Sequence, residues 1–386
     1  MKNTKSIYLF IPVMLAFFTM GFVDLVGIAT NYMKADFHLS DTLANLFASM
    51  IFFWFLVLSL PTGLLMNRIG RKKTVVISMV VTLFSLLIPM VSYNFGMMII
   101  SFILLGIGNT LMQVSLNPLL ANIVSANRMS SALTFGQFIK AIASFLAPLI
   151  AAWAAISFSD WRLLLFPIYS GICLIAIIYL AGTKINEQKT ESSNATFKDC
   201  FILLGDASIL IFFIGIMAHV GLDVGINTTA PKLLMQKAGM SLSEAGFASS
   251  FYFIFRTFGC LMGFFILSRF SNKKVFLVSV LMILSGILAL FSSSVTIIYI
   301  GIALFGVGNS NVFPVIFSQA LKAKPMQNNE VSGLMIMGIF GGAIIPLLMG
   351  ITSDLLNKQE GALIILLLCV IYLAGIVRRK IKKTYT

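Results

Sequence analysis

The chain has 386 residues, of which 59% are hydrophobic and only 10% are charged. Soluble domains carry about 25% charged residues, so this composition excludes an ordinary soluble protein and indicates an integral membrane protein. The net charge of +14 does not indicate nucleic-acid binding here, because the basic residues gather on one side of a predicted membrane topology.

Apolar stretches of about 20 residues recur along the whole chain, and each is long enough to cross a bilayer as a helix. The first follows Lys2 and Lys5 as a secretory signal would, but it is too long and lacks a cleavage site, so we expect it to be retained. We predict an all-α membrane protein with twelve transmembrane helices. Their expected extents are 7–33, 42–66, 74–93, 96–124, 130–156, 162–182, 207–234, 244–267, 275–292, 294–321, 330–353 and 361–377.

The connections between these segments differ in charge. If the N-terminus is cytoplasmic, twenty basic residues fall in inside connections and five fall outside. The positive-inside rule therefore predicts that both termini are cytoplasmic. Short loops, with no eukaryotic targeting element, favour a bacterial inner membrane. The five outside residues are Lys34, Arg162, Lys232, Lys237 and Lys358.

The longest polar stretch divides six predicted helices from six. We expect an N-terminal bundle at 1–182, a cytoplasmic linker at 183–205 and a C-terminal bundle at 206–386. A shift of about 200 residues superimposes several motifs of the two halves, as an internal repeat predicts. Asp24 then meets Asp223, and Asn109 meets Asn309. Because most matching residues are Gly, Asn, Asp and Lys, chance similarity between Leu- and Phe-rich helices is the weaker alternative.

Four charged residues lie well inside predicted helices, where a charge costs several kcal/mol unless it is paired or hydrated. A transport pathway is favoured over a purely structural ion pair, because both acidic residues stand beside clustered Asn, Thr and Gly. The four are Asp24, Lys140, Asp223 and Arg256.

Polar side chains also recur at helical spacing. Asn109, Gln113 and Asn117 stand four residues apart, so they share one helix face, and His219 and Asn227 flank Asp223 in the same way. These stripes predict a hydrated substrate cavity, although a single amide could instead join two helices. The candidate substrate-binding residues are Asn31, Asn109, Gln113, Asn117, Gln137, Lys140, His219, Asn227, Tyr252 and Arg256.

The carboxylates are the groups that can carry a coupling proton. We expect Asp24 to be the first candidate and Asp223 the second, with His219 as a residue that could either titrate or simply pack. A permanent salt bridge from Lys140 or Arg256 to Asp24 would move coupling elsewhere or abolish it.

Two parallel six-helix repeats resemble the major facilitator fold, with its two pseudo-symmetric six-helix bundles. Residues 63–73, after the second predicted helix, resemble that superfamily's loop motif G-x-L-x-D-R-x-G-R-K-x. Asn67 replaces the usual Asp, so the resemblance implies an electrostatically weaker cytoplasmic latch; an ordinary positive-inside loop is the alternative. The expected gating residues are Gly63, Asn67, Arg68, Gly70 and Arg71.

The helical motifs also resemble the family of fucose, galactose and glucose proton symporters. Residues 219–227 are similar to its seventh-helix pattern, with Asp223 at the position of a Glu, and residues 252–259 are similar to its eighth-helix motif, which supplies Arg256. Asp24 matches the first-helix Asp of that family. Asn117 and Gln137 match polar residues of its fourth and fifth helices.

Two departures from the family make the expected cavity more cationic. Gln113 stands where the family has an acidic residue, and Lys140 stands where it has a sugar-binding Asn. An anionic sugar or a related organic anion is therefore a second candidate substrate, since Lys140 or Arg256 could bind its carboxylate.

The resemblance implies a secondary active transporter that imports a monosaccharide or sugar-like solute with a proton by alternating access. An acidic-sugar or organic-anion carrier is the main alternative, and a drug or lipid exporter or a non-transporting receptor is less favoured. We expect no enzyme, cofactor or metal site, because catalytic sets, metal spacings and nucleotide fingerprints are absent. The expected partners are the solute, the proton and membrane lipid, with no nucleic acid and a monomeric state.

Overall fold

The computed structural model describes residues 2–38, 41–187, 197–240 and 242–379. Inside these ranges the description excludes the side chains of residues 2–7, 27–28, 30–31, 34–35, 41–50, 148, 197, 199, 242–244, 246, 354 and 378–379. All regular structure in the described ranges is helical, which confirms the predicted all-α class. The contacts divide the chain into two compact units.

Eleven described helical stretches are long and apolar enough to cross a membrane, and Tyr8–Asp24 is a shorter apolar one. The first predicted segment differs from a plain helix, because it is interrupted by one short 3₁₀ turn. It consists of α1 (Lys2–Met20), the 3₁₀ turn η1 (Gly21–Asp24) and α2 (Leu25–Asp36). The tenth and eleventh predicted segments are also divided, as the bounds below show.

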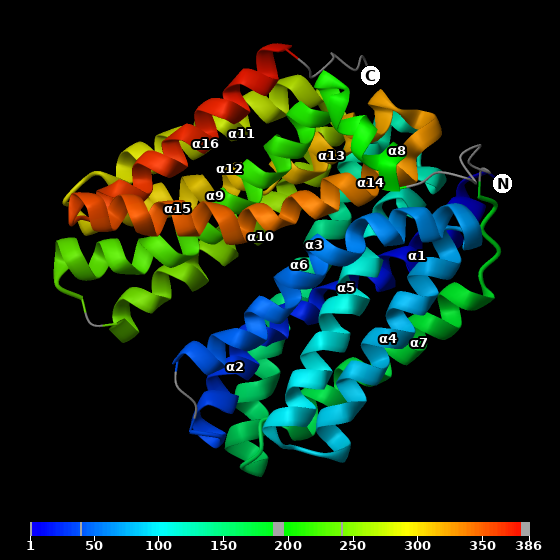
Figure 1. Cartoon of the computed structure of the whole chain (residues 1–386), viewed down its shortest axis with the longest axis horizontal. Coiled ribbons are helices and arrows are strands. Elements are labelled where there is room, and N and C mark those ends of the chain that lie inside the picture. Colours follow the sequence, from blue (N-terminus) through cyan, green and yellow to red (C-terminus); the bar gives the residue numbers. More distant parts are fainter. Residues whose placement is uncertain (1, 39–40, 188–196, 241, 380–386) are drawn as a thin grey trace. The chain divides into compact units, whose positions relative to one another are not determined.

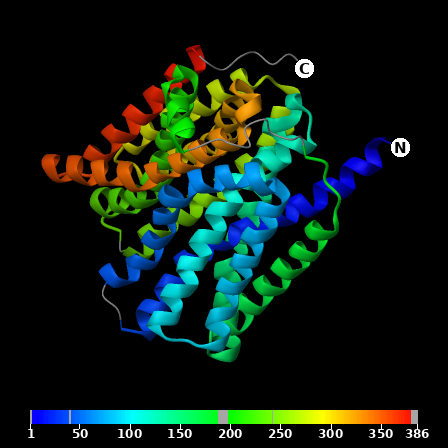
Figure 2. The same ribbon diagram turned by 45° about the vertical axis from the view of Figure 1, so that its right-hand side comes forward.

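Unit 1 comprises residues 1–125, 139–201 and 324–337. In this unit α4 packs against α5 and α7, and α3 packs against α5 (Figures 1 and 2). α1 contacts α5 and α7, and α2 contacts α3, so both parts of the interrupted helix pack against neighbours in this unit. Besides α1, η1 and α2, its helices are α3 (Asp41–Ile69), α4 (Arg71–Val91), α5 (Phe95–Ile123), most of α6 (Met129–Phe158), α7 (Arg162–Gly182), most of α8 (Phe197–Ile202), η4 (Pro325–Gln327) and α14 (Asn328–Met337).

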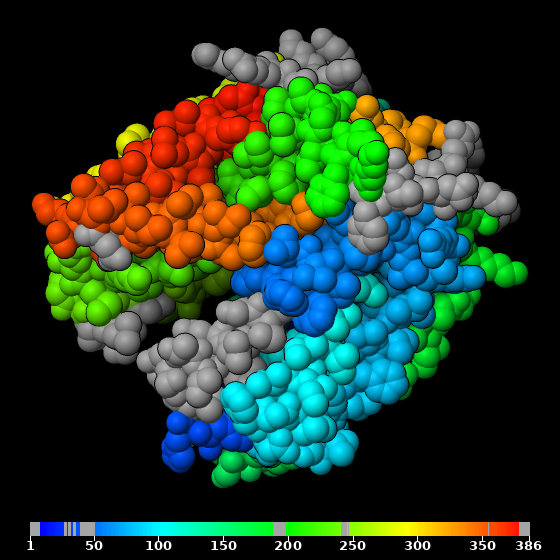
Figure 3. Space-filling model, viewed as in Figure 1, coloured from blue at the N-terminus to red at the C-terminus, as the bar shows by residue number. Residues whose placement is uncertain are grey.

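Unit 2 comprises residues 126–138, 202–323 and 338–386. α9 is its central element and contacts α10, α13, α15 and α16, while α12 packs against α10 and α11. Figure 3 shows α15 and α16, in orange and red, side by side on the surface. Its helices are η2 (Ala126–Arg128), the start of α6, η3 (Leu203–Gly205), α9 (Ala207–Ala238), α10 (Leu242–Arg269), α11 (Asn272–Leu290), α12 (Val295–Asn309), α13 (Val312–Ala323), η5 (Gly338–Phe340), α15 (Gly341–Leu356) and α16 (Glu360–Arg379).

Each unit includes one short segment from the other half of the sequence. Residues 324–337 belong to unit 1, and residues 126–138 belong to unit 2. The two segments are matched by the repeat, and each bonds to a helix of its own unit: Ser332 Oγ donates to Val114 O of α5 at 2.5 Å, and Ser131 Oγ donates to Phe264 O of α10 at 2.7 Å. The expected boundary at 183–205 stays a prediction.

Candidate functional site

The carboxylate of Asp24 lies at the end of η1, beside α6. Ser144 Oγ donates to its Oδ2 at 2.5 Å, and Lys140 Nζ lies 3.7 Å from the same oxygen. The Asp24 side chain is 44% exposed, whereas that of Lys140 is 20% exposed. Since exposed pairs at such a distance contribute little, this contact is a loose ion pair that leaves the carboxylate accessible.

The polar stripe of α5 is buried and satisfies most of its own hydrogen-bonding groups. Gln113 Nε2 donates to Asn109 Oδ1 at 2.7 Å, and Asn117 Nδ2 donates to the carbonyl of Gln113 at 3.0 Å. Asn109 Nδ2 donates to the carbonyl of Met20 at 2.8 Å, which joins α5 to the end of α1. For Asn109 the structure therefore supports an interhelical bond rather than an open position in a cavity.

A second polar cluster in unit 2 is centred on Asp223 of α9. Arg256 of α10 lies 3.3 Å from its Oδ2, the hydroxyl of Tyr252 donates to its Oδ1, and Asn309 Nδ2 approaches the same Oδ1 at 3.3 Å. Asn309 Nδ2 also donates to the Tyr252 oxygen at 3.0 Å. With three partners and a side chain that is 19% exposed, Asp223 is held far more tightly than Asp24.

His219 belongs to this cluster through Asn309. Its Nδ1 lies 2.9 Å from Asn309 Oδ1, and its side chain is only 3% exposed. Because the amide N–H group faces the carboxylate of Asp223, the amide oxygen faces the histidine, whose Nδ1 is then the donor. His219 is thus a buried member of the network rather than a solvent-facing residue.

Asn227 and Gln137 are two further predicted binding residues whose side chains the structure describes. Asn227 Nδ2 donates to the carbonyl of Asp223 at 2.8 Å, so this side chain bonds to its own helix. Gln137 is half-buried in the part of α6 that belongs to unit 2. The side chain of Asn31 lies outside the described residues.

The end of α3 and the start of α4 form a largely buried network with α14, inside unit 1. Asn67 Nδ2 donates to Glu330 Oε1 at 2.5 Å, and Asn329 Nδ2 donates to Asn67 Oδ1 at 2.7 Å. Arg71 Nε donates to Asn329 Oδ1 at 2.8 Å. Glu330 is only 1% exposed, so a carboxylate is present in this network although the loop itself has none.

A second carboxylate caps α4. Gly70 adopts a φ of 90°, which favours glycine, and as the N-cap residue it offers no side chain to the first N–H groups of α4. Glu187 supplies the cap instead: it accepts from Arg71 N at 2.6 Å and from Lys72 N at 2.8 Å. Of the other gating residues, Arg68 is exposed, and a Cβ at Gly63 would lie 2.9 Å from the carbonyl of Asn329.

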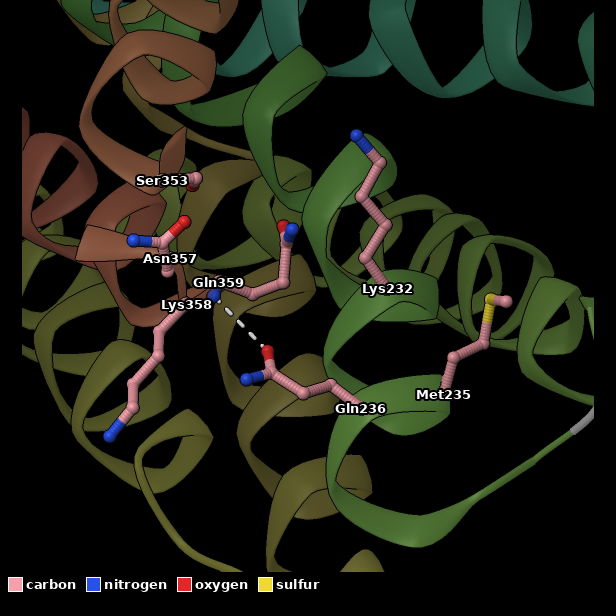
Figure 4. Close-up of a pocket in the computed structure, with 7 residues that line it drawn as sticks. All are labelled: Lys232, Met235, Gln236, Ser353, Asn357, Lys358 and Gln359. Atoms are coloured by element: carbon pink, nitrogen blue, oxygen red, sulfur yellow. Dashed lines mark hydrogen bonds between the residues drawn. The ribbon is translucent and has the colours of Figure 1, made fainter. Parts of the chain in front are cut away.

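An open hollow of about 540 Å³ lies in unit 2, at the ends of α9 and α15 and the start of α16. Figure 4 shows that the side chains of Lys232 and Lys358 point in different directions, while Gln359 N donates to Gln236 Oε1 at 3.1 Å. None of its lining residues is a predicted site residue, so the charged clusters, and not this hollow, define the candidate site. Its lining residues are Lys232, Met235, Gln236, Ser353, Asn357, Lys358 and Gln359.

Residues 12–335 and 207–384 match the sequence model of the Major Facilitator Superfamily. The chain belongs to this superfamily. It is therefore a multi-pass membrane transport protein and not an enzyme, as the sequence predicted.

Curated relatives and a solved structure cover most of this facilitator. It is 25% identical to a glucose/galactose transporter of Brucella abortus biovar 1 (strain 9-941), over 93% of this chain and 91% of that protein. It is also 25% identical to a probable nitrate transporter, NarT, of Staphylococcus haemolyticus (strain JCSC1435), over 80% of each chain. A structure of the E. coli fucose:proton symporter FucP superposes with a TM-score of 0.81 at 17% identity, over 97% of this chain and 98% of that one.

The structure adds residues to the site that the sequence reading missed. The repeat could have indicated Asn309, because it corresponds to the predicted site residue Asn109. Ser144 shares a helix face with Gln137 and Lys140 in the sequence, but its bond to Asp24 was not predicted. Glu330 and Glu187 had no signal in the sequence, because they meet the superfamily loop motif across 263 and 116 residues of chain.

Proposed function

We propose that this facilitator is a secondary active transporter that imports a monosaccharide or sugar-like solute together with a proton. The relatives named glucose/galactose transporter support a sugar, and the fold shared with a fucose:proton symporter is compatible with proton coupling. One observation carries the proposal: Asp24 is a half-exposed carboxylate at a helix interruption, with one hydroxyl donor and one loosely placed cation.

The comparison of the two acidic residues makes Asp24 the coupling group. A proton carrier must lose its ionic partner and reach water in some part of the cycle, and a loose pair with 44% exposure allows this. Asp223 is tied to an arginine, a tyrosine and an asparagine, so its protonation would break several bonds at once. We assign Asp223 to the fixed framework of the site and Asp24 to the proton.

The same residues suggest how a solute is held. Sugar hydroxyl groups bind well to charged donors and acceptors, and Lys140 and Arg256 offer such donors beside their carboxylates. When a solute hydroxyl or carboxylate binds Lys140, the attraction of Lys140 for Asp24 weakens. Solute binding is thereby coupled to the proton site. The proposed setting is a bacterial inner membrane, with a monomer whose termini both face the cytoplasm.

An acidic-sugar or organic-anion carrier is the second candidate. Two cations in the membrane-spanning part, the absence of an acid at position 113 and a relative named probable nitrate transporter all favour it. The same chemistry would serve: a carboxylate on the solute would form charge-assisted bonds with Lys140 or Arg256.

Transport by the purified protein in proteoliposomes tests the proposal. A panel of neutral hexoses, deoxyhexoses, amino sugars and sugar acids is added, and external pH is followed together with solute uptake. We expect alkalinisation driven by at least one neutral sugar. Uptake of sugar acids alone would select the anion carrier, and solute uptake without any proton movement would refute proton symport.

A further inference from the structure

The first membrane helix is interrupted at the position of the proposed proton carrier. α1 ends at Met20, and Asp24 closes the 3₁₀ turn η1 before α2 begins. The repeat-related helix α9 runs without interruption from Ala207 to Ala238, through Asp223. The interruption at Asp24 thus has no counterpart at its repeat mate Asp223.

α6 and α7 hold one side of this turn. A Cβ at Gly21 would lie 2.8 Å from the Cβ of Ala143, so the two backbones approach closely there. The ring of Phe22 stacks on that of Tyr169 with centroids 4.0 Å apart, and the Tyr169 hydroxyl donates to the carbonyl of Ala143 at 2.5 Å. The turn is therefore fixed against the stretch of α6 that carries the partners of Asp24.

α5 holds the other side through one amide. Asn109 Nδ2 donates to the carbonyl of Met20, the last residue of α1, at 2.8 Å. The orientation of this amide is fixed, because Gln113 Nε2 donates to Asn109 Oδ1 from the other side. Both side chains are buried, with Asn109 3% exposed. A buried carbonyl at a helix interruption needs such a donor.

We propose that Asn109 is a positioning residue for the coupling carboxylate, a role that rests on the proposed function of Asp24. In an uninterrupted α-helix the carbonyl of Met20 would accept from the N–H group of Asp24. Asn109 takes up one of the two acceptor positions of that carbonyl, which reduces the gain from the α-helical bond and so favours the tighter turn. A 3₁₀ helix advances about 120° per residue and an α-helix about 100°. The turn therefore decides which way Asp24 faces, and Asn109 maintains the turn without touching Asp24.

The test compares variants of Asn109 with Asp24→Asn and a matched control in proteoliposomes. Asn109→Leu keeps a similar volume and has no donor. Asn109→Asp is nearly isosteric and has a donor only when its carboxyl group is protonated. Ser115→Ala is the control, because this buried hydroxyl of α5 bonds only to carbonyls of its own helix. Sugar-driven proton uptake and sugar counterflow are measured for each protein.

We expect Asn109→Leu to lose about tenfold in proton-coupled uptake, the effect of one lost buried hydrogen bond, and to keep its counterflow. Asn109→Asp should behave like Asn109→Leu at neutral pH and recover relative to the parent as the pH is lowered, whereas Ser115→Ala should match the parent. Coupled uptake that survives in Asn109→Leu, or an equal loss of uptake and counterflow in both Asn109 variants, would overturn the positioning role. Proton uptake that survives in Asp24→Asn would instead overturn the proposed function.

Discussion

Asp24 and Asp223, the two acids inside the membrane-spanning segments, differ in how many groups hold them. Asp24 has one hydroxyl donor and a cation at 3.7 Å, while Asp223 has Arg256, Tyr252 and Asn309. The sequence identified both acids and both cations from their place in apolar segments. It could not assign the pairs, because helical spacing shows which residues share a face but not which helix that face meets.

This difference predicts unequal effects on stability. Asp223→Asn removes the charge that pairs with Arg256 and weakens two further bonds, so it should destabilise the protein by about 1–3 kcal/mol. Asp24→Asn should destabilise the protein clearly less, because the side chain of Asp24 is 44% exposed. Thermal unfolding of the two variants in the same detergent compares them. Equal losses, or a larger loss for Asp24→Asn, would contradict the assignment of Asp223 to a fixed framework.

At the scale of helices and loops, the superfamily motif at the junction of α3 and α4 differs from the usual pattern in the position of its acidic residue. Asn67, in the last turn of α3, stands where the superfamily pattern has Asp, and this predicted an electrostatically weaker latch. The structure places the buried carboxylate of Glu330 from α14 against that amide. An acid is therefore present in this contact, but it comes from Glu330 of α14 and not from position 67. The expected weakening of the latch considered the loop motif alone and did not include Glu330.

A reciprocal exchange tests this arrangement. Asn67→Asp should place two carboxylates against each other and lower the melting temperature, and Glu330→Gln should lower it moderately. The double variant restores the superfamily's acid in the loop and should recover stability, with a coupling energy of about 1–2 kcal/mol in a double-mutant cycle. Strictly additive losses would show that the two side chains do not depend on each other.

The connection between α6 and α7 contains a charged pair outside the membrane-spanning segments. Partial burial alone would raise the pKa of Asp160, but hydrogen bonds from the side chain and backbone of Arg162 outweigh it and hold the pKa below its ordinary value of 3.8. A lowered pKa in the folded state means that Asp160 stabilises the protein above its unfolded pKa and that this contribution is lost as the pH falls through the folded pKa.

Asp160→Asn should therefore lower the melting temperature at neutral pH. The difference from the parent should shrink as the pH is brought below about 3.8, where the parent's own carboxyl group becomes protonated. Thermal unfolding of both proteins across this pH range measures the difference in melting temperature. A difference that stays constant with pH would mean that the ionised pair contributes nothing.

At the scale of the whole molecule, composition and hydropathy were enough to predict the helical class, and the repeat and loop motif indicated the superfamily. The interruption at Gly21–Asp24 was not predictable, because the apolar run continues through it and glycine is common in membrane helices. Contacts over more than a hundred residues, such as Glu187 on α4, also escape local patterns. Both arise from packing, which a single sequence does not display.

The two halves match in sequence but differ in the surroundings of their repeat-related acids. Unit 1 presents an accessible carboxylate at an interrupted helix, and unit 2 presents a carboxylate enclosed in a network on a continuous helix. This asymmetry is the physical basis for assigning the proton to Asp24.

Sugar-driven proton uptake by Asp24→Asn, compared with its sugar counterflow, tests this central claim most directly. Counterflow exchanges labelled for unlabelled solute and needs no net proton movement, so it reports binding and alternating access alone. We predict that Asp24→Asn retains counterflow and loses sugar-driven alkalinisation. Alkalinisation at the parent's rate in Asp24→Asn would contradict the account and move the proton to another group.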